Sequence, residues 1–90
     1  MLQIKNIAIA GTGNLSWHLA KNLKKIGISI SGVWSRNPDH TKEFGEYFSI
    51  KPCFEITDLK ANTDLIIMAI SDSAIEDVAR QLGNFPVLLL

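Results

Sequence analysis

The residues best suited to bind a ligand form one short segment that contains two glycines, Gly11-Thr12-Gly13-Asn14-Leu15-Ser16. Gly11 would allow a sharp turn of the backbone, and Gly13 would let main-chain N–H groups approach an anion closely because it has no side chain. Where such a turn opens a helix, the first N–H groups lack intrahelical partners and the helix dipole favours negative charge. The spacing therefore predicts a pyrophosphate site, with contacts from Gly11, Thr12, Gly13, Asn14 and Leu15.

The segment departs from the G-x-G-x-x-G fingerprint of dinucleotide-binding proteins at its last position, which is Ser16. That position serves the packing of the helix on the preceding strand, for which a small residue is sufficient. A glycine turn without a ligand is the alternative interpretation. Dinucleotide binding is favoured because the segment is the first strand-to-helix turn of an alternating pattern.

A second polar segment, Trp34-Ser35-Arg36-Asn37, indicates which dinucleotide would bind. NAD-binding domains carry an acid about twenty residues after the glycines to hold the ribose 2′-hydroxyl, whereas this chain has no acid between Gly11 and Asp39. The Arg36 guanidinium can pair with a 2′-phosphate and stack on adenine, and Ser35 and Asn37 can donate further hydrogen bonds. We therefore predict NADP as the cofactor. The alternative is that Arg36 is only a solvated loop charge.

A third segment, Ile70-Ser71-Asp72-Ser73, follows the most hydrophobic stretch of the chain. Ile70 and Ser71 are expected to contact the ribose or the diphosphate. Asp72 and Ser73 are better explained as caps of the next helix.

The sequence predicts no catalytic residue and no metal site. The carboxylates are scattered, and no cluster has the spacing of metal ligands. His18 and His40 are expected on the surface, and the single cysteine, Cys53, is expected to be a small buried hydrophobe rather than a nucleophile.

The composition excludes several classes of protein. Nine basic and nine acidic residues give zero net charge, which argues against nucleic-acid binding. No apolar run is long enough to cross a bilayer, and the N-terminus lacks the layout of a signal peptide. Because 90 residues support one domain, we assign residues 1–90 to a single unit. The single cysteine and the lack of a signal-peptide layout or a membrane-spanning run lead us to expect a cytoplasmic protein.

The elements that must position these segments alternate between strands and helices. We predict strands over 4–10, 28–34, 51–54, 64–70 and 86–90, with helices after the first, second and fourth and one helical turn at 57–60. Alternation of this kind gives a three-layer, doubly wound, mostly parallel sheet of the Rossmann-like α/β class, with expected strand order 3-2-1-4-5.

The helices are predicted from their apolar stripes and end signals. The first should bury Leu15, Leu19, Leu23 and Ile26 and end at Gly27; the second should begin at Asn37-Pro38 and bury Phe44, Tyr47 and Phe48. The third should begin with a capping box, Ser73 to Glu76, and bury Ile75, Val78, Ala79 and Leu82.

Together the glycine turn, the Ser35-Arg36 pair and the Ile70-Ser71-Asp72 segment resemble a bacterial group of NADP oxidoreductases of the coenzyme F-420-dependent type, related to pyrroline-5-carboxylate reductase. The resemblance covers essentially the whole chain. It implies NADP-linked redox chemistry on a small substrate. Members of the group usually continue into a helical domain that supplies substrate contacts and catalytic residues, so this chain resembles their N-terminal, cofactor-binding part.

The expected function is therefore that of an NADP(H)-binding domain of an oxidoreductase whose substrate domain lies outside the chain. The alternative is a nucleotide-sensing or protein-interaction module with the same fold and no redox activity. The apolar stretch Val87 to Leu90 also predicts self-association, through this last strand or through the missing domain.

Overall fold

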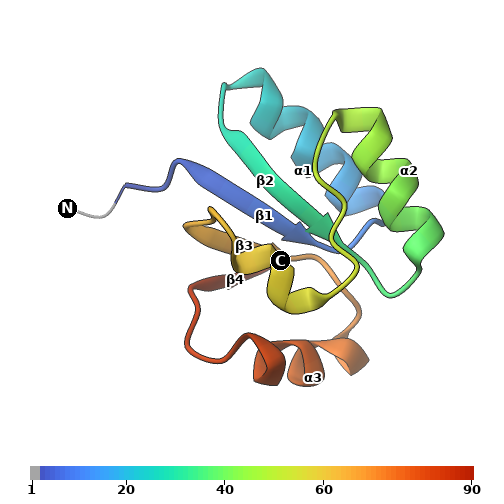
Figure 1. The fold of residues 1–90 in the computed structure, drawn as a ribbon, viewed down its shortest axis with the longest axis vertical. Coiled ribbons are helices and arrows are strands. Elements are labelled where there is room, and N and C mark those ends of the chain that lie inside the picture. Colours follow the sequence, from blue (N-terminus) through green and yellow to red (C-terminus); the bar gives the residue numbers. More distant parts are fainter. Residues whose placement is uncertain (1–2) are drawn as a thin grey trace.

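The computed structural model describes residues 3–90 as one parallel sheet flanked by helices (Figure 1). The strands are β1 (Asn6–Ala10), β2 (Ser29–Trp34), β3 (Leu65–Met68) and β4 (Val87–Leu89), in the order β2-β1-β3-β4. The helices are α1 (Asn14–Lys25), α2 (Pro38–Phe48), α3 (Asp72–Leu82) and a short 3-10 helix, η1 (Ile56–Lys60). The predicted α/β class and parallel sheet are confirmed.

The strand predicted at 51–54 is wrong, and the sheet has four strands. Only Pro52 makes a bridge to Val33 of β2, with the Val33 N–H donating to Lys51 O and the Cys53 N–H to Val33 O. Beyond Cys53 the ladder does not extend because its next donor is used elsewhere: the Ser35 N–H donates to the Thr41 hydroxyl at 3.0 Å. The segment lies at the predicted edge of the sheet without becoming a strand.

Each face of the sheet has its own core, which gives the three layers that the sequence predicted. α1 and α2 cover one face, and α3 and η1 cover the other (Figure 1). The alternation along β1 shows the division, since Ile7 and Ile9 face α1 and α2 while Ala8 and Ala10 face η1 and α3.

The buried stripe of α1 differs from the predicted one. The buried residues are Ser16, Ala20 and Leu23, whereas Leu15 is 54% exposed and Ile26 is 69% exposed. Small residues bring the first turns of α1 close to the sheet, and this rotates Leu15 outward. The end of the helix is as predicted, because Gly27 has φ +82° and the Ile28 N–H returns to Leu23 O at 2.9 Å.

The other two helices also need corrections. In α2, Phe44 and Phe48 are buried as predicted, but Tyr47 is 70% exposed, with its ring against those of Trp17 and Phe48.

The capping box of α3 is not formed. The N-cap of α3 lies two residues before the predicted cap, Ser73. The N-cap residue is Ser71, so Asp72 and Ser73 lie inside the first turn, and the cap residue makes no side-chain hydrogen bond to the helix. The buried residues of α3 are Ala74, Val78 and Leu82, with Ile75 partly buried and Ala79 exposed.

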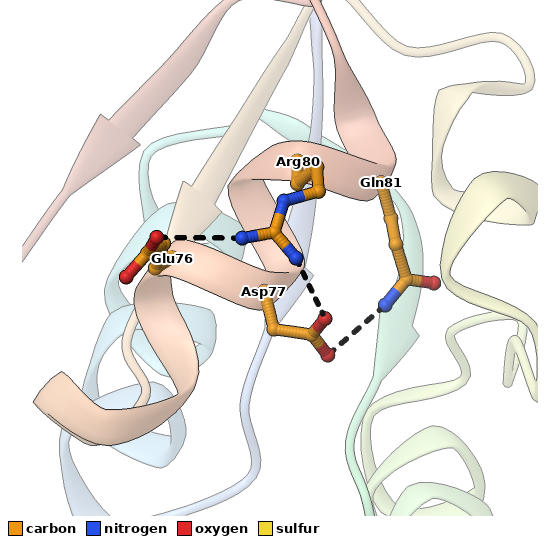
Figure 2. A network of polar contacts seen from close by, with 4 residues as sticks. All are labelled: Glu76, Asp77, Arg80 and Gln81. Atoms are coloured by element: carbon orange, nitrogen blue, oxygen red, sulfur yellow. Dashed lines mark hydrogen bonds and ion pairs between the residues drawn. The ribbon is translucent and has the colours of Figure 1, made fainter.

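The outer face of α3 carries a small network of polar side chains (Figure 2). Arg80 pairs with Glu76 at 3.3 Å and with Asp77 at 4.0 Å, and Gln81 donates to Asp77 at 3.2 Å. These exposed contacts at i,i+3 and i,i+4 spacing stabilise the helix only slightly. Within residues 3–90, no helix combines the length and the apolar character needed to cross a membrane.

We expect Asp64, which lies just before β3, to make the free energy of unfolding vary with pH. Its Oδ2 accepts hydrogen bonds from the backbone N–H groups of Asn6 and Lys5, both at 2.9 Å, and these bonds hold the pKa of the carboxyl below its ordinary value. A lowered folded-state pKa stabilises the fold above the unfolded-state pKa, and this contribution is lost as pH falls through the folded-state pKa. Asp64→Asn should therefore lower the urea midpoint at neutral pH, with the difference from wild type shrinking in acid. Glu46→Gln, on the exposed side of α2, is the control and should show no such convergence.

Candidate functional site

The carboxyl ends of three strands meet at one point, and backbone hydrogen bonds continue past them. The Gly11 N–H donates to Trp34 O at 2.6 Å, which joins the residue after β1 to the end of β2. The Ala69 N–H donates to Ala10 O at 2.9 Å, which joins the residue after β3 to the end of β1. A cavity of about 250 Å³ opens directly beyond these bonds. Its position is that of a ligand site in a doubly wound sheet, outside the strand ends where the order reverses.

The cavity brings together residues from all three predicted segments. Those that line it are Gly11, Thr12, Ser35, Arg36, Asn37, Ile70 and Ser71. Gly13, Asn14 and Leu15 do not line it; they lie beside it, where α1 begins. The cavity is also lined by Trp34, Ala69, Ala74 and His40, which the sequence reasoning missed. The strand-end positions of Trp34 and Ala69 could have indicated them, whereas His40 and Ala74 reach the cavity only because their helices begin at it.

Glycine is present at the two positions of the turn for different physical reasons. Gly11 has φ +123°, and a Cβ there would lie 2.3 Å from the Ala69 carbonyl oxygen, so no other residue fits. Gly13 has the ordinary φ of −76°, and no atom lies within 4 Å of the place where its Cβ would be. Folding therefore does not require glycine at Gly13. The open space in front of its backbone is a cradle that a Cβ would partly fill.

The start of α1 has the features of an anion-binding site. Its first backbone hydrogen bond is from Trp17 to Gly13 O, and within residues 3–90 neither a side chain nor a carbonyl accepts from the N–H groups of Asn14 and Leu15. The first turn of α1 contains no acid, whereas α2 and α3 each carry an aspartate in theirs. Free N–H groups and an unopposed dipole make this end of α1 suited to an anion.

Trp17 fixes the glycine turn to the helices. Its indole N–H donates to Thr12 O at 3.1 Å, and its ring packs edge-on against Phe44 of α2 with centroids 5.2 Å apart. Phe44 is fully buried. The turn is thus held by a side chain that belongs to the core between α1 and α2.

A hydroxyl network shapes the loop between β2 and α2. The Ser35 hydroxyl donates to Asn37 O at 2.9 Å and lies 2.7 Å from the hydroxyl of Thr41, which is buried. Asn37 caps α2 as predicted, since its Oδ1 accepts from the N–H groups of Asp39 and His40. The Ser35 hydroxyl is therefore engaged within the loop, and the Asn37 amide keeps its NH₂ group for a ligand.

Arg36 projects from this loop as an exposed side chain. Both ion pairs found within residues 3–90 belong to Arg80, so Arg36 has no carboxylate partner there. The residues that line the cavity include no aspartate or glutamate. The site therefore presents a free guanidinium without a competing negative charge.

The remaining candidate groups do not form a reactive centre. Cys53 is buried as predicted, and burial raises the pKa of its thiol, which disfavours the reactive thiolate. His18 is exposed as predicted and does not line the cavity. The part of the chain from 3 to 90 contains no group of three or more potential metal ligands.

A parallel α/β sheet with a glycine turn at its switch point, opening a helix whose N-terminus is free, defines the Rossmann class of dinucleotide-binding domains. Within that class, residues 6–88 match the family described as NADP oxidoreductase, coenzyme F420-dependent. The chain belongs to this family and is an NAD(P)-binding domain of it. Comparison with curated protein sequences finds no match.

Solved structures agree with this fold. An NADP oxidoreductase, BF3122 from Bacteroides fragilis, is 24% identical with a TM-score of 0.82, over 96% of this chain and 35% of its own. Pyrroline-5-carboxylate reductase from Coxiella burnetii is 22% identical with a TM-score of 0.82, over 98% and 36%. Biliverdin reductase from Synechocystis sp. PCC 6803 is 20% identical with a TM-score of 0.80, over 94% and 28%. At these identities the likeness concerns the fold, and the chain spans about a third of each of these proteins.

The two glycines should respond differently to alanine. Gly11→Ala forces a Cβ against the Ala69 carbonyl and should destabilise the fold by about 2 kcal/mol or more. Gly13→Ala should change the free energy of unfolding by no more than about 1 kcal/mol, because its backbone conformation and surroundings accept a side chain. Urea unfolding followed by circular dichroism measures both. Equal destabilisation by the two changes would contradict the assignment of Gly13 to the cradle.

Proposed function

We propose that this domain binds NADP(H) in preference to NAD(H), as the cofactor-binding part of an oxidoreductase that acts on a small substrate. The observation that carries the proposal is the cavity at the strand ends, which contains Arg36 and no carboxylate. A carboxylate at this place would bind the 2′-hydroxyl of NAD and repel a 2′-phosphate. An unpaired guanidinium favours the phosphate.

The residues around the cavity fit the parts of the cofactor. The N–H groups of Asn14 and Leu15, beside the open space at Gly13, would hold the pyrophosphate. Arg36 would pair with the 2′-phosphate and lie against the adenine, and the free NH₂ group of Asn37 would donate to the same phosphate.

The other lining residues have supporting roles. Ile70 and Ser71 would contact the ribose from the end of β3, and Ser35 would maintain the loop that carries Arg36.

Bound NADP(H) supplies the hydride chemistry, and the protein supplies placement. This chain would orient the cofactor through the start of α1 and the loop after β2. We propose that substrate contacts and proton-transfer groups come from parts of the oxidoreductase outside these residues. The relatives support this division, because this chain spans about a third of each, and the biliverdin reductase structure is a complex with both biliverdin and NADP+.

The two arginines of the chain form a matched pair for testing cofactor choice. Arg36→Gln should weaken NADPH binding roughly ten- to a hundredfold, the worth of charge-assisted hydrogen bonds to a phosphate, and weaken NADH binding much less. Arg80→Gln, which removes the surface contacts of α3 shown in Figure 2, should leave both affinities unchanged. Isothermal titration calorimetry of both nucleotides gives the dissociation constants. The cofactor proposal fails if neither nucleotide binds at millimolar concentration, or if Arg36→Gln leaves the preference for NADPH as it was.

We also propose that the edge of the sheet at β4 mediates association of two copies of the chain. Leu88, Leu89 and Leu90 are 48%, 52% and 53% exposed, and among the strands of residues 3–90 β4 pairs with one neighbour only, β3. Exposed apolar edge strands favour pairing with another chain. Leu89→Lys should lower the average mass measured by light scattering at high protein concentration. Ile26→Lys, at an exposed apolar position at the end of α1, is the control. A wild-type chain that stays monomeric would contradict this proposal.

A further inference from the structure

Trp17 makes two hydrogen bonds to the glycine turn, one from its side chain and one from its backbone. The indole N–H donates to Thr12 O and the backbone N–H donates to Gly13 O, both at 3.1 Å. Thr12 lines the cavity at the strand ends and also a second cavity of about 210 Å³, whereas Trp17 lines only the second. One residue of α1 therefore holds two successive carbonyl groups of the turn, and its indole reaches them from the side of the second cavity.

The direction of the indole N–H is set by the core between α1 and α2. The indole ring packs against the rings of Phe44, Tyr47 and Phe48, with centroids 5.2, 4.7 and 5.0 Å away. Phe44 and Phe48 are buried. Because three rings of α2 hold the indole, its N–H is a fixed point to which the turn is attached.

The bond to Thr12 O orients the whole peptide group between Thr12 and Gly13. In a trans peptide the C=O and N–H groups point in opposite directions, so a carbonyl directed at Trp17 places the Gly13 N–H on the far side. Within residues 3–90 no group accepts a hydrogen bond from this N–H, and the space in front of Gly13 is open. The Gly13 N–H can therefore bind an anion together with the free N–H groups at the start of α1.

The sequence of the turn does not restrain this peptide by itself. A flip of the peptide changes ψ of Thr12 and φ of Gly13, and glycine adopts positive φ about as readily as negative φ. The flipped peptide would direct the Thr12 carbonyl oxygen, which carries partial negative charge, toward the place of the anion. The glycine that leaves the cradle open thus also makes the flip easy, and the bond from Trp17 opposes it.

We propose that Trp17 is a positioning residue for the pyrophosphate of the cofactor, because its indole N–H holds the Thr12–Gly13 peptide with the N–H directed at the anion. The inference rests on the proposed dinucleotide function and adds the side chain that pre-forms its anion site. Pre-formed donors bind more tightly because they need no ordering when the ligand arrives. Since NADPH and NADH share the pyrophosphate, Trp17 should contribute equally to both, whereas Arg36 should distinguish them.

The experiment titrates the ¹⁵N-labelled full chain with NADPH, NADH and inorganic pyrophosphate. Trp17→Phe keeps an aromatic ring and removes the N–H donor, so it should weaken NADPH and NADH binding by the same factor, roughly five- to tenfold. The shift of the Gly13 amide signal caused by pyrophosphate should shrink with it. Tyr47→Phe is the matched control, because it removes a polar atom from a ring of the same cluster that lines neither cavity. It should leave all three titrations unchanged.

A second variant separates the N–H donor from the packing of the ring. Benzothienylalanine has the shape of tryptophan with a sulfur atom in place of the N–H group. The chain has two tryptophans, so a Trp34→Phe background leaves Trp17 as the only position that takes up the analogue. Compared with the same background carrying tryptophan, the analogue should weaken the binding of both nucleotides equally.

The outcomes separate this inference from the proposed function. If the analogue binds both nucleotides as tightly as tryptophan does, the role of Trp17 is overturned and the NADP proposal stands. A loss for NADPH alone would also overturn it, because the effect would then lie at the 2′-phosphate. If the wild-type chain binds pyrophosphate but neither nucleotide, the NADP proposal fails, and the pyrophosphate titrations of the same variants decide the role of Trp17. If it binds none of the three, both proposals fail.

Discussion

The structure depends on the close approach of two backbone segments at the end of β1. Gly11 turns with φ +123° against the Ala69 carbonyl, at a distance that leaves no room for a Cβ. On either side of this approach, the Gly11 N–H donates a hydrogen bond to Trp34 O, and the Ala69 N–H donates one to Ala10 O. The ends of three strands are thereby fixed relative to one another. Because Trp34, Gly11 and Ala69 also line the cavity, its floor is a direct consequence of the register of the sheet.

The same approach determines where α1 begins. The chain leaves the turn with only two residues between Gly11 and the first helical residue, and Ser16 and Ala20 let the helix lie close to the sheet. The packing is tight at Ser16, since a Cβ placed on Gly11 would lie 3.2 Å from the Ser16 hydroxyl oxygen. This close packing holds the free N–H groups of α1 beside the cavity. An uncapped helix end is tolerated there because it is open to solvent and to a ligand.

Much of the fold and of the site could be predicted because these features depend on local sequence signals. The glycine turn and the helix end at Gly27 follow from positive-φ conformations that few residues adopt, and the cap at Asn37 follows from a side-chain oxygen that accepts from the first N–H groups of α2. The wrong predictions have two causes, a competing hydrogen-bond acceptor and packing between helices. The strand at 51–54 is prevented by the Thr41 hydroxyl, which accepts from the Ser35 N–H that a longer ladder would use. The buried face of α1 and the lining role of His40 depend on packing between helices, which no local pattern specifies.

In the loop after β2, the residues that stabilise the loop lie directly beside the residue proposed to select the cofactor. Arg36 can be exposed and unpaired because its neighbours keep the loop in shape, with Ser35 bonded to Asn37 and Thr41 and with Asn37 bonded to the start of α2. The residues on either side of the guanidinium are therefore structural first, and their contribution to a ligand is what remains after the loop is formed. An acid placed at Ser35 to hold a 2′-hydroxyl would remove the donor to Asn37 O and place a charge beside the buried Thr41. In the proposed NADP(H) complex, the groups that meet the 2′-phosphate would thus be held by the same hydrogen bonds that shape this corner of the fold.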